Sequence, residues 1–181
     1  MRAICALLWV IVAGSLAFAQ TPAVEFGSQR YIKKKEMALR ADEISVEFGL
    51  EKEPLAAWTR LLTFHWLPNA DMKPASAAGT MGKFIEGHAE VLGSRVLDHP
   101  KTGEAMLDIL YAMPKSEMVE FNVYKYAPSG IGKGLVAARY AFRFNLGERE
   151  GTEVRKLKTR AVAQMGKFDM AAVRSYFDKP R

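Results

Sequence analysis

The residues best suited to catalytic or metal chemistry in this chain are its three histidines, His65, His88 and His99. An imidazole can bind zinc or exchange a proton near neutral pH. His65 and His88 could therefore form a site with a carboxylate, if folding brought them together. The candidate carboxylates are Glu86, Glu90 and Asp98. A small metal- or histidine-dependent hydrolase is thus one interpretation of the chain.

The sequence around each histidine favours a structural role instead. No pair has the spacing of a metal motif such as His-Glu-x-x-His. His88 lies on the apolar face of an expected helix, which is typical of a hydrogen-bonded core histidine. Asp98-His99-Pro100 is typical of a turn, because Asp and Pro both favour turns. We therefore predict no catalytic residue, no metal and no cofactor, and a non-enzymatic role is favoured.

Covalent and phosphate chemistry lack complete motifs. None of the serines has the Gly-x-Ser-x-Gly context of an exposed nucleophile. Residues 129–134 read Ser-Gly-Ile-Gly-Lys-Gly, but Gly134 stands where a phosphate-binding loop needs Ser or Thr. This segment also joins two expected strands, so we predict a hairpin connection.

The C-terminal part of the chain combines basic residues with an apolar stripe. The stripe is Val154, Leu157, Ala161, Met165 and Phe168, and the candidate binding cations around it are Arg155, Lys158 and Arg160. A basic amphipathic helix can dock on anionic lipid. It can also pack its stripe on a sheet and leave the charges in water, which is the commoner outcome. Contact with an anionic membrane surface is therefore a second alternative.

A second candidate binding surface combines tyrosine and cations on two expected strands. Tyr124 is out of phase with the apolar residues of its strand, and Lys125 follows it. Arg139 and Arg143 are expected to share the wet face of the next strand. Tyr and Arg are favoured at binding hot spots. These four residues could form a recognition patch, unless a covering helix buries the tyrosine.

Hydrophobic periodicity predicts the elements that must position these residues. Alternating apolar residues indicate strands, and spacings of three and four indicate helices. We expect strands at 23–33, 44–48, 61–66, 95–98, 107–113, 119–123 and 136–144. We expect a short helix from Leu55 carrying Trp58, a long helix at 74–92, and helices at 154–168 and 171–177. The fold class is therefore α+β: a twisted, mainly antiparallel sheet with a long central helix and a C-terminal helix packed on it.

The N-terminus predicts export. Residues 1–19 have a positive start, an apolar middle and small residues at Ala17 and Ala19, which is the layout of a cleaved Sec-type signal peptide. Residues 20–181 would then form a single domain. The one cysteine, Cys5, lies inside the signal, so the mature chain would have no disulfide and no thiol nucleophile. We expect a periplasmic or secreted protein.

The net charge of +6 is modest. For an exported protein, such an excess suggests an anionic surface or an acidic partner rather than nucleic acid. We expect a partner protein or another envelope component.

The order of elements resembles the Mog1/PsbP-like fold, which includes small exported proteins of the DcrB type. Residues 53–63, Glu-Pro-Leu-Ala-Ala-Trp-Thr-Arg-Leu-Leu-Thr, are similar to the proline-to-tryptophan helix that leads into a strand of such proteins. The resemblance implies an α/β/α sandwich and little about activity, because folds of this kind serve unrelated roles. The function expected from the sequence is an exported, non-enzymatic accessory or binding protein of the bacterial cell envelope.

Overall fold

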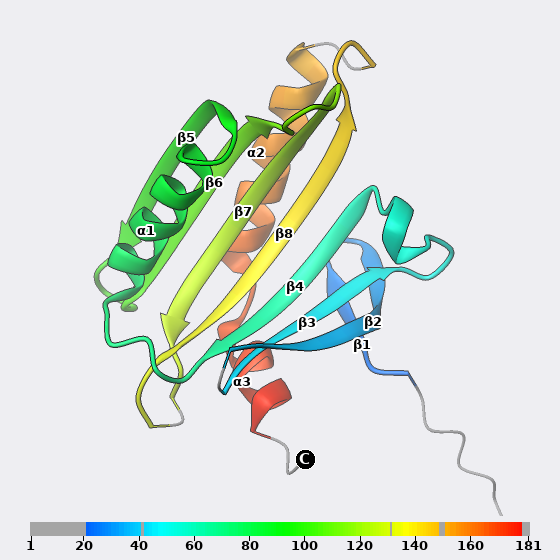
Figure 1. Ribbon diagram of the computed structural model, residues 1–181. Helices are drawn as coiled ribbons and strands as arrows, with labels where there is room; N and C mark the ends of the chain where they lie inside the picture. The colour runs from blue at the N-terminus through cyan, green and yellow to red at the C-terminus, as the bar shows by residue number, and fades with distance from the viewer. Residues whose placement is uncertain (1–20, 41, 131, 149–150, 179–181) are drawn as a thin grey trace, which may run out of the picture.

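An antiparallel β-sheet organises the structure (Figure 1). The computed structural model describes residues 21–178 other than Ala41, Ile131, Arg149 and Glu150. The expected signal peptide at 1–19 lies outside the described residues. The strands are β1 (Ala23–Phe26), β2 (Gln29–Arg40), β3 (Glu43–Leu50), β4 (Arg60–Leu67), β5 (Glu90–His99), β6 (Glu104–Ala112), β7 (Met118–Pro128) and β8 (Leu135–Asn145). The helices are the 3-10 helix η1 (Leu55–Ala57) and the α-helices α1 (Pro74–Glu86), α2 (Gly151–Lys167) and α3 (Met170–Phe177).

The sheet consists of two four-stranded meanders. Its strand order is β1-β2-β3-β4-β8-β7-β6-β5, and every neighbouring pair is antiparallel. The last strands of the two meanders, β4 and β8, pair with each other, with Phe64 opposite Ala138. The predicted α+β class and antiparallel sheet are confirmed, and residues 129–134 connect β7 to β8 as predicted.

The expected first strand at 23–33 is a hairpin of two strands. Phe26 pairs with Gln29, so Gly27 and Ser28 form a two-residue turn. Gly27 has a φ of +63°. Glycine at the first central position is typical of the type II′ turns that suit the twist of hairpins. The prediction merged the strands because apolar residues continue on both sides of this turn.

The long helix expected at 74–92 ends early. α1 has 13 residues, and Gly87 forms its C-cap. The apolar residues that extended the predicted helix belong to β5, where Val91 pairs with Tyr111. The adjacent apolar residues Val91 and Leu92 are too few to distinguish a helix from a strand, and strand pairing decided between them. The long central helix is therefore not found in the structure.

The helices lie on opposite faces of the sheet (Figure 1). α1 packs on β5, β6 and β7 and forms one buried cluster with side chains such as Leu107 and Ile109. α2 and α3 pack on the other face, where the larger cluster contains Phe64, Phe121 and Met165. The apolar stripe of α2 is thus turned toward the sheet, which is the commoner of the two outcomes expected from the sequence.

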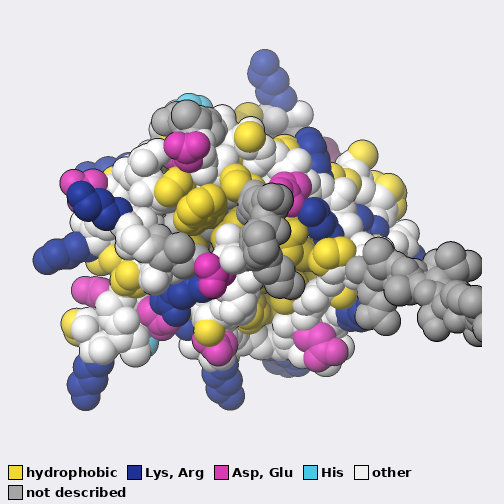
Figure 2. All heavy atoms as spheres, turned by 90° about the horizontal axis from the view of Figure 1, so that it is seen from below, with side chains coloured by type: hydrophobic (Ala, Val, Ile, Leu, Met, Phe, Trp, Pro, Cys, Tyr) yellow, Lys and Arg dark blue, Asp and Glu magenta, His cyan; other side chains and the backbone are white. Residues whose placement is uncertain are grey.

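The charges of the molecule are distributed over several sides. In the view of Figure 2, Lys and Arg side chains project in different directions with Asp and Glu between them. Of the helices in the described part of the chain, none has the length and apolarity needed to cross a bilayer.

Candidate ligand-binding pocket

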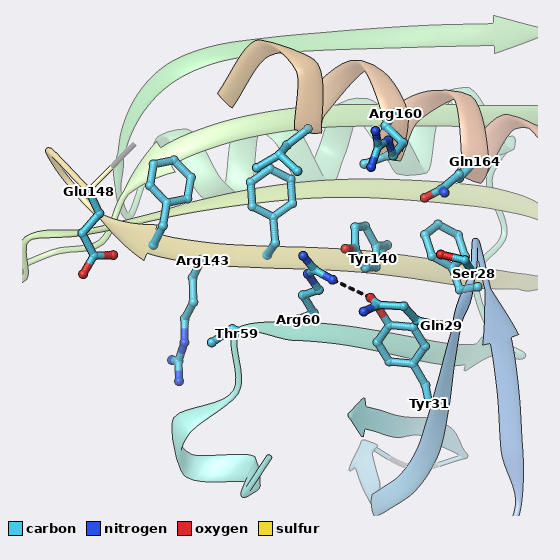
Figure 3. A pocket seen from close by; sticks show the side chains of 15 residues that line it. Ser28, Gln29, Tyr31, Thr59, Arg60, Tyr140, Arg143, Glu148, Arg160 and Gln164 are labelled. Carbon is cyan, nitrogen blue, oxygen red and sulfur yellow. Dashed lines mark hydrogen bonds between the residues drawn. The ribbon is translucent and has the colours of Figure 1, made fainter. Parts of the chain in front are cut away.

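A pocket of about 280 Å³ opens between α2, β8 and the β1–β2 hairpin (Figure 3). The alternation of β8 directs Tyr140, Phe142 and Phe144 to the sheet face that carries α2. The pocket therefore lies where the second meander meets the hairpin of the first. We call it the hairpin pocket.

Aromatic side chains form the floor of the hairpin pocket. The ring of Phe26 stacks on Tyr140 with their centroids 4.6 Å apart, and Phe142 stacks on Phe144 at 6.0 Å. None of these four residues is more than 8% exposed. The rings pack mainly on one another, so only small parts of their surfaces are open to the apolar part of a ligand.

A row of hydrogen-bonded polar side chains borders this floor. Arg60 donates from Nη1 to Gln29 Oε1 at 2.6 Å, as the dashed line in Figure 3 shows. The Tyr31 hydroxyl donates to the same oxygen at 3.1 Å. Burial raises the pKa of Tyr31, and the neighbouring Tyr140 raises it further. Tyr31 therefore keeps its proton, and Arg60 is held in place with further N–H donors besides the one used on Gln29.

The rim of the hairpin pocket is basic at one end. Arg160 and Gln164 lie on α2 above the floor, and Glu148 lies at the opposite end (Figure 3). Arg143 also borders the pocket, but its side chain points away toward η1 (Figure 3). Arg60 and Arg160 are therefore the cations that a ligand in the pocket would meet.

Arg143 is engaged with the segment around η1. Its Nε donates to the Trp58 carbonyl at 2.5 Å, and its Nη2 donates to the Ala56 carbonyl at 3.2 Å. The guanidinium also lies 4.4 Å from the centroid of the Trp58 ring, within the range of a cation–π contact. These contacts assign Arg143 to holding η1 against β8.

The side chains that line the hairpin pocket are suited to binding an anion. Its polar lining consists of arginine, glutamine, tyrosine, serine and threonine side chains, together with the carboxylate of Glu148. Arginine forks recognise carboxylates and phosphates, and the aromatic floor suits an apolar body. The arrangement can hold and orient a small organic anion.

The structure does not bring the seven predicted binding residues into one site. Arg143 and Arg160 border the hairpin pocket. Arg155 and Lys158 line a separate groove on the other side of α2. The remaining three residues of β7 and β8 are buried or nearly so, and they fall on opposite faces of the sheet.

Tyr124 and Arg139 lie on the α1 face in a buried polar cluster. Arg139 donates to Glu120 and to Asn122, each at 2.5 Å, and the Tyr111 hydroxyl donates to Glu120 at 2.9 Å. Burial alone would lower the pKa of Arg139, but Tyr124 and Glu120 raise it. Arg139 therefore stays charged and is satisfied from within the protein. The sequence predicted that Arg139 and Arg143 would share a wet face of β8. The structure instead places the Arg139 side chain against Glu120.

Lys125 lies on the face of α2 and not on a wet face. It is 4% exposed, and its Nζ donates to the carbonyls of Gly166 at 3.2 Å and Phe168 at 2.9 Å. An ion pair with Glu104 at 3.2 Å completes its contacts. A cation suits the carbonyl-rich end of a helix. Lys125 is in phase with the apolar residues of β7, and this signal could have placed it correctly.

The three histidines lie on separate elements. His65 is on β4 and His99 ends β5, whereas His88 follows α1 and contacts the Phe84 carbonyl through Nδ1 at 2.7 Å. Within the described residues, no three His, Cys, Asp or Glu side chains are grouped so that they could hold a metal ion.

His65 is expected to make the stability of the protein depend on pH. Burial and the nearby charge of Arg139 lower the pKa of His65 to about 4, so the folded state takes up its proton less readily than the unfolded chain. Stability is therefore complete above the ordinary pKa of 6.5 and is lost as pH falls from there to about 4. The loss due to His65 is at most about 3 kcal/mol.

Denaturant unfolding of the wild type and of His65→Gln, at neutral pH and near pH 4.5, measures this term. We expect the wild type to lose more stability than the variant over this interval. Equal losses in the two proteins would assign the acid sensitivity to other groups.

Sequence reasoning missed most of the hairpin pocket. Gln29 and Arg60 meet although 31 positions separate them in the chain, and no motif connects them. A strand-terminal arginine such as Arg60 is an ordinary feature of a sequence. Only the antiparallel pairing of β2 with β3 and of β3 with β4 brings Arg60 close to the hairpin.

Comparison with known proteins identifies a family. A protein-family model matches residues 18–172. No curated protein matches the chain.

Proposed function

Since the chain belongs to the family whose model spans residues 18–172, we propose that this family member is an exported, non-enzymatic binding protein of the bacterial cell envelope. The observation that carries the proposal is the hairpin pocket, with Arg60 and Arg160 above a floor of stacked aromatic rings. The ligand is a small organic anion with a planar apolar part.

The size of the pocket supports a small ligand. Its volume of about 280 Å³ is just below the range of roughly 300–1,000 Å³ that is typical of small-molecule sites. An aromatic carboxylate could lay its ring on the floor while its oxygens met the arginines. N–H groups of Arg60 and Arg160 would donate to the carboxylate, and these charge-assisted hydrogen bonds would be weaker with a neutral analogue.

The same family member is proposed to have the Mog1/PsbP-like arrangement. Helices on both faces of an antiparallel sheet, and the short helix η1 before β4, support this assignment. Export is supported by the pattern of residues 1–19. The intact mass of protein purified from the periplasm would test export, since loss of residues 1–19 is expected.

The binding proposal is tested by titration calorimetry with two probes of nearly equal shape. Phenylacetate carries the charge, and phenylacetamide is its neutral analogue. We expect phenylacetate to bind at least about tenfold more tightly, because hydrogen bonds to charged groups contribute about 1.5–3 kcal/mol. Arg160→Met should weaken phenylacetate binding by a similar factor.

The matched control is Arg155→Met, which removes a cation from the same helix but from outside the hairpin pocket. It should leave phenylacetate binding within about twofold of the wild type, the size of a screened surface charge effect. Equal binding of the two probes, or equal effects of the two substitutions, would contradict the proposed site.

A further inference from the structure

A second hollow runs along the other side of α2. This groove, of about 540 Å³, lies between α2 and strands β5 and β6 and extends to the residues that follow β8. Its apolar wall includes Leu92, Leu110, Leu146, Val154 and Val162. We call it the leucine groove.

Two large apolar side chains of the leucine groove are strongly exposed. Leu146 is 71% exposed and Leu92 is 49% exposed. They lie on different segments, one after β8 and one in β5, and they line the same groove. Single exposed leucines are ordinary, whereas apolar residues that converge from two segments mark interaction surfaces.

Cations border these leucines. Arg155 and Lys158 project from α2 at a spacing of three residues, which places them on one side of the helix. Lys158 also lies 5.3 Å from the centroid of the Phe121 ring. The acid in the lining, Asp108, is held by Arg95 at 2.7 Å. The groove thus presents leucines beside cations and is positive overall.

We infer that the leucine groove docks the protein on the surface of an anionic phospholipid bilayer. Leu92 and Leu146 would enter the boundary between headgroups and acyl chains, while Arg155 and Lys158 meet the phosphates. Apolar insertion and cation attraction together give binding that neither gives alone. An acidic protein with an apolar ridge is the other occupant that these residues would suit, and failure to bind either kind of vesicle would point to it instead.

This mode differs from the one that the sequence of α2 suggests. The helix does not lie on lipid through its own stripe, because Ala161 and Met165 are buried against the sheet. The apolar contact comes from residues outside the helix, and only two of the three predicted cations take part. Arg160 points to the hairpin pocket instead.

Vesicle co-sedimentation tests the inference with protein purified from the periplasm. The vesicles are phosphatidylcholine alone, or phosphatidylcholine containing phosphatidylglycerol. We expect binding to the anionic vesicles only, weakened by added salt. Arg155→Glu/Lys158→Glu should lower the partition coefficient at least about tenfold, and Leu146→Ser should lower it about threefold or more.

Matched controls separate the groove from general charge and apolarity. Lys156→Glu/Lys167→Glu makes the same change of net charge on α2 at positions that do not line the groove. Leu39→Ser removes a leucine that is 48% exposed on β2. Both controls should stay within about threefold of the wild type, since the attraction falls off within a Debye length.

Equal binding to both kinds of vesicle, or equal losses in the control and groove variants, would overturn the inference. Circular dichroism of each variant shows that a loss of binding is not a loss of folding. The outcome is independent of the hairpin pocket, because phenylacetate titration reads that site separately.

Discussion

Replacing Arg139 by methionine is expected to lower the free energy of unfolding by about 3–5 kcal/mol. The substitution leaves the buried carboxylate of Glu120, whose side chain is 5% exposed, without its cation. It also removes the donor that binds Asn122. The cost comes from an uncompensated buried charge rather than from lost apolar area, since methionine fills much of the same volume. Urea unfolding at neutral pH, with linear extrapolation, measures the change.

A double-mutant cycle with Glu120→Gln identifies the cause of this loss. Removing the charge of Glu120 should recover part of the stability lost in Arg139→Met, so the double variant should be more stable than additivity predicts. Arg30→Met changes an exposed arginine of β2 and should cost less than about 0.5 kcal/mol. Strict additivity would show that the pair is not coupled in the folded state.

The second large effect is expected at Gly134, just before β8. Gly134 has a φ of +95°, and a Cβ atom there would lie 2.4 Å from the Leu67 carbonyl oxygen and 2.5 Å from that of Pro68. These are backbone atoms of the paired strand end, so no side chain can rotate away. Gly134→Ala should therefore destabilise the protein by about 4 kcal/mol, from backbone strain and steric overlap together.

Gly132→Ala is the matched control for this prediction. Gly132 lies in the same connection and has a φ of +73°, but a Cβ atom there would meet nothing within 4 Å. Its substitution should cost only the strain of a positive φ, about 1–2 kcal/mol. Equal losses at the two positions, measured by urea unfolding, would show that the approach to Leu67 and Pro68 can relax.

Much of the fold could be predicted because it depends on local alternation. The strands around Phe121 and Phe142 have one apolar face and short connections, and such patterns indicate an antiparallel meander. The errors fall where local signals are shared between two structures. Val91 fits a helix face and a strand equally well, and Gly27 interrupts a run that otherwise continues as one strand.

The candidate site could be predicted much less well. Arg160 was predicted to be a binding cation. Its position in the same pocket as Arg60, above the aromatic floor, depends on segments that are far apart in the chain. Lys125 was assigned to a surface, whereas its ammonium group lies at the carbonyl end of α2. A cation and its partner can be far apart in the sequence, and hydrophobic periodicity does not indicate which distant residues come into contact.

Local periodicity and composition were enough to predict the fold class, the strands β6, β7 and β8, and the basic character of α2. Tertiary structure alone decided which face each cation serves. It turned Arg160 to the hairpin pocket, Arg155 and Lys158 to the leucine groove, and Arg139 into the protein. The physical reason is that burial, charge pairing and cavity shape depend on the pairing of β4 with β8 and on the packing of α2. These are interactions between residues that the chain keeps far apart.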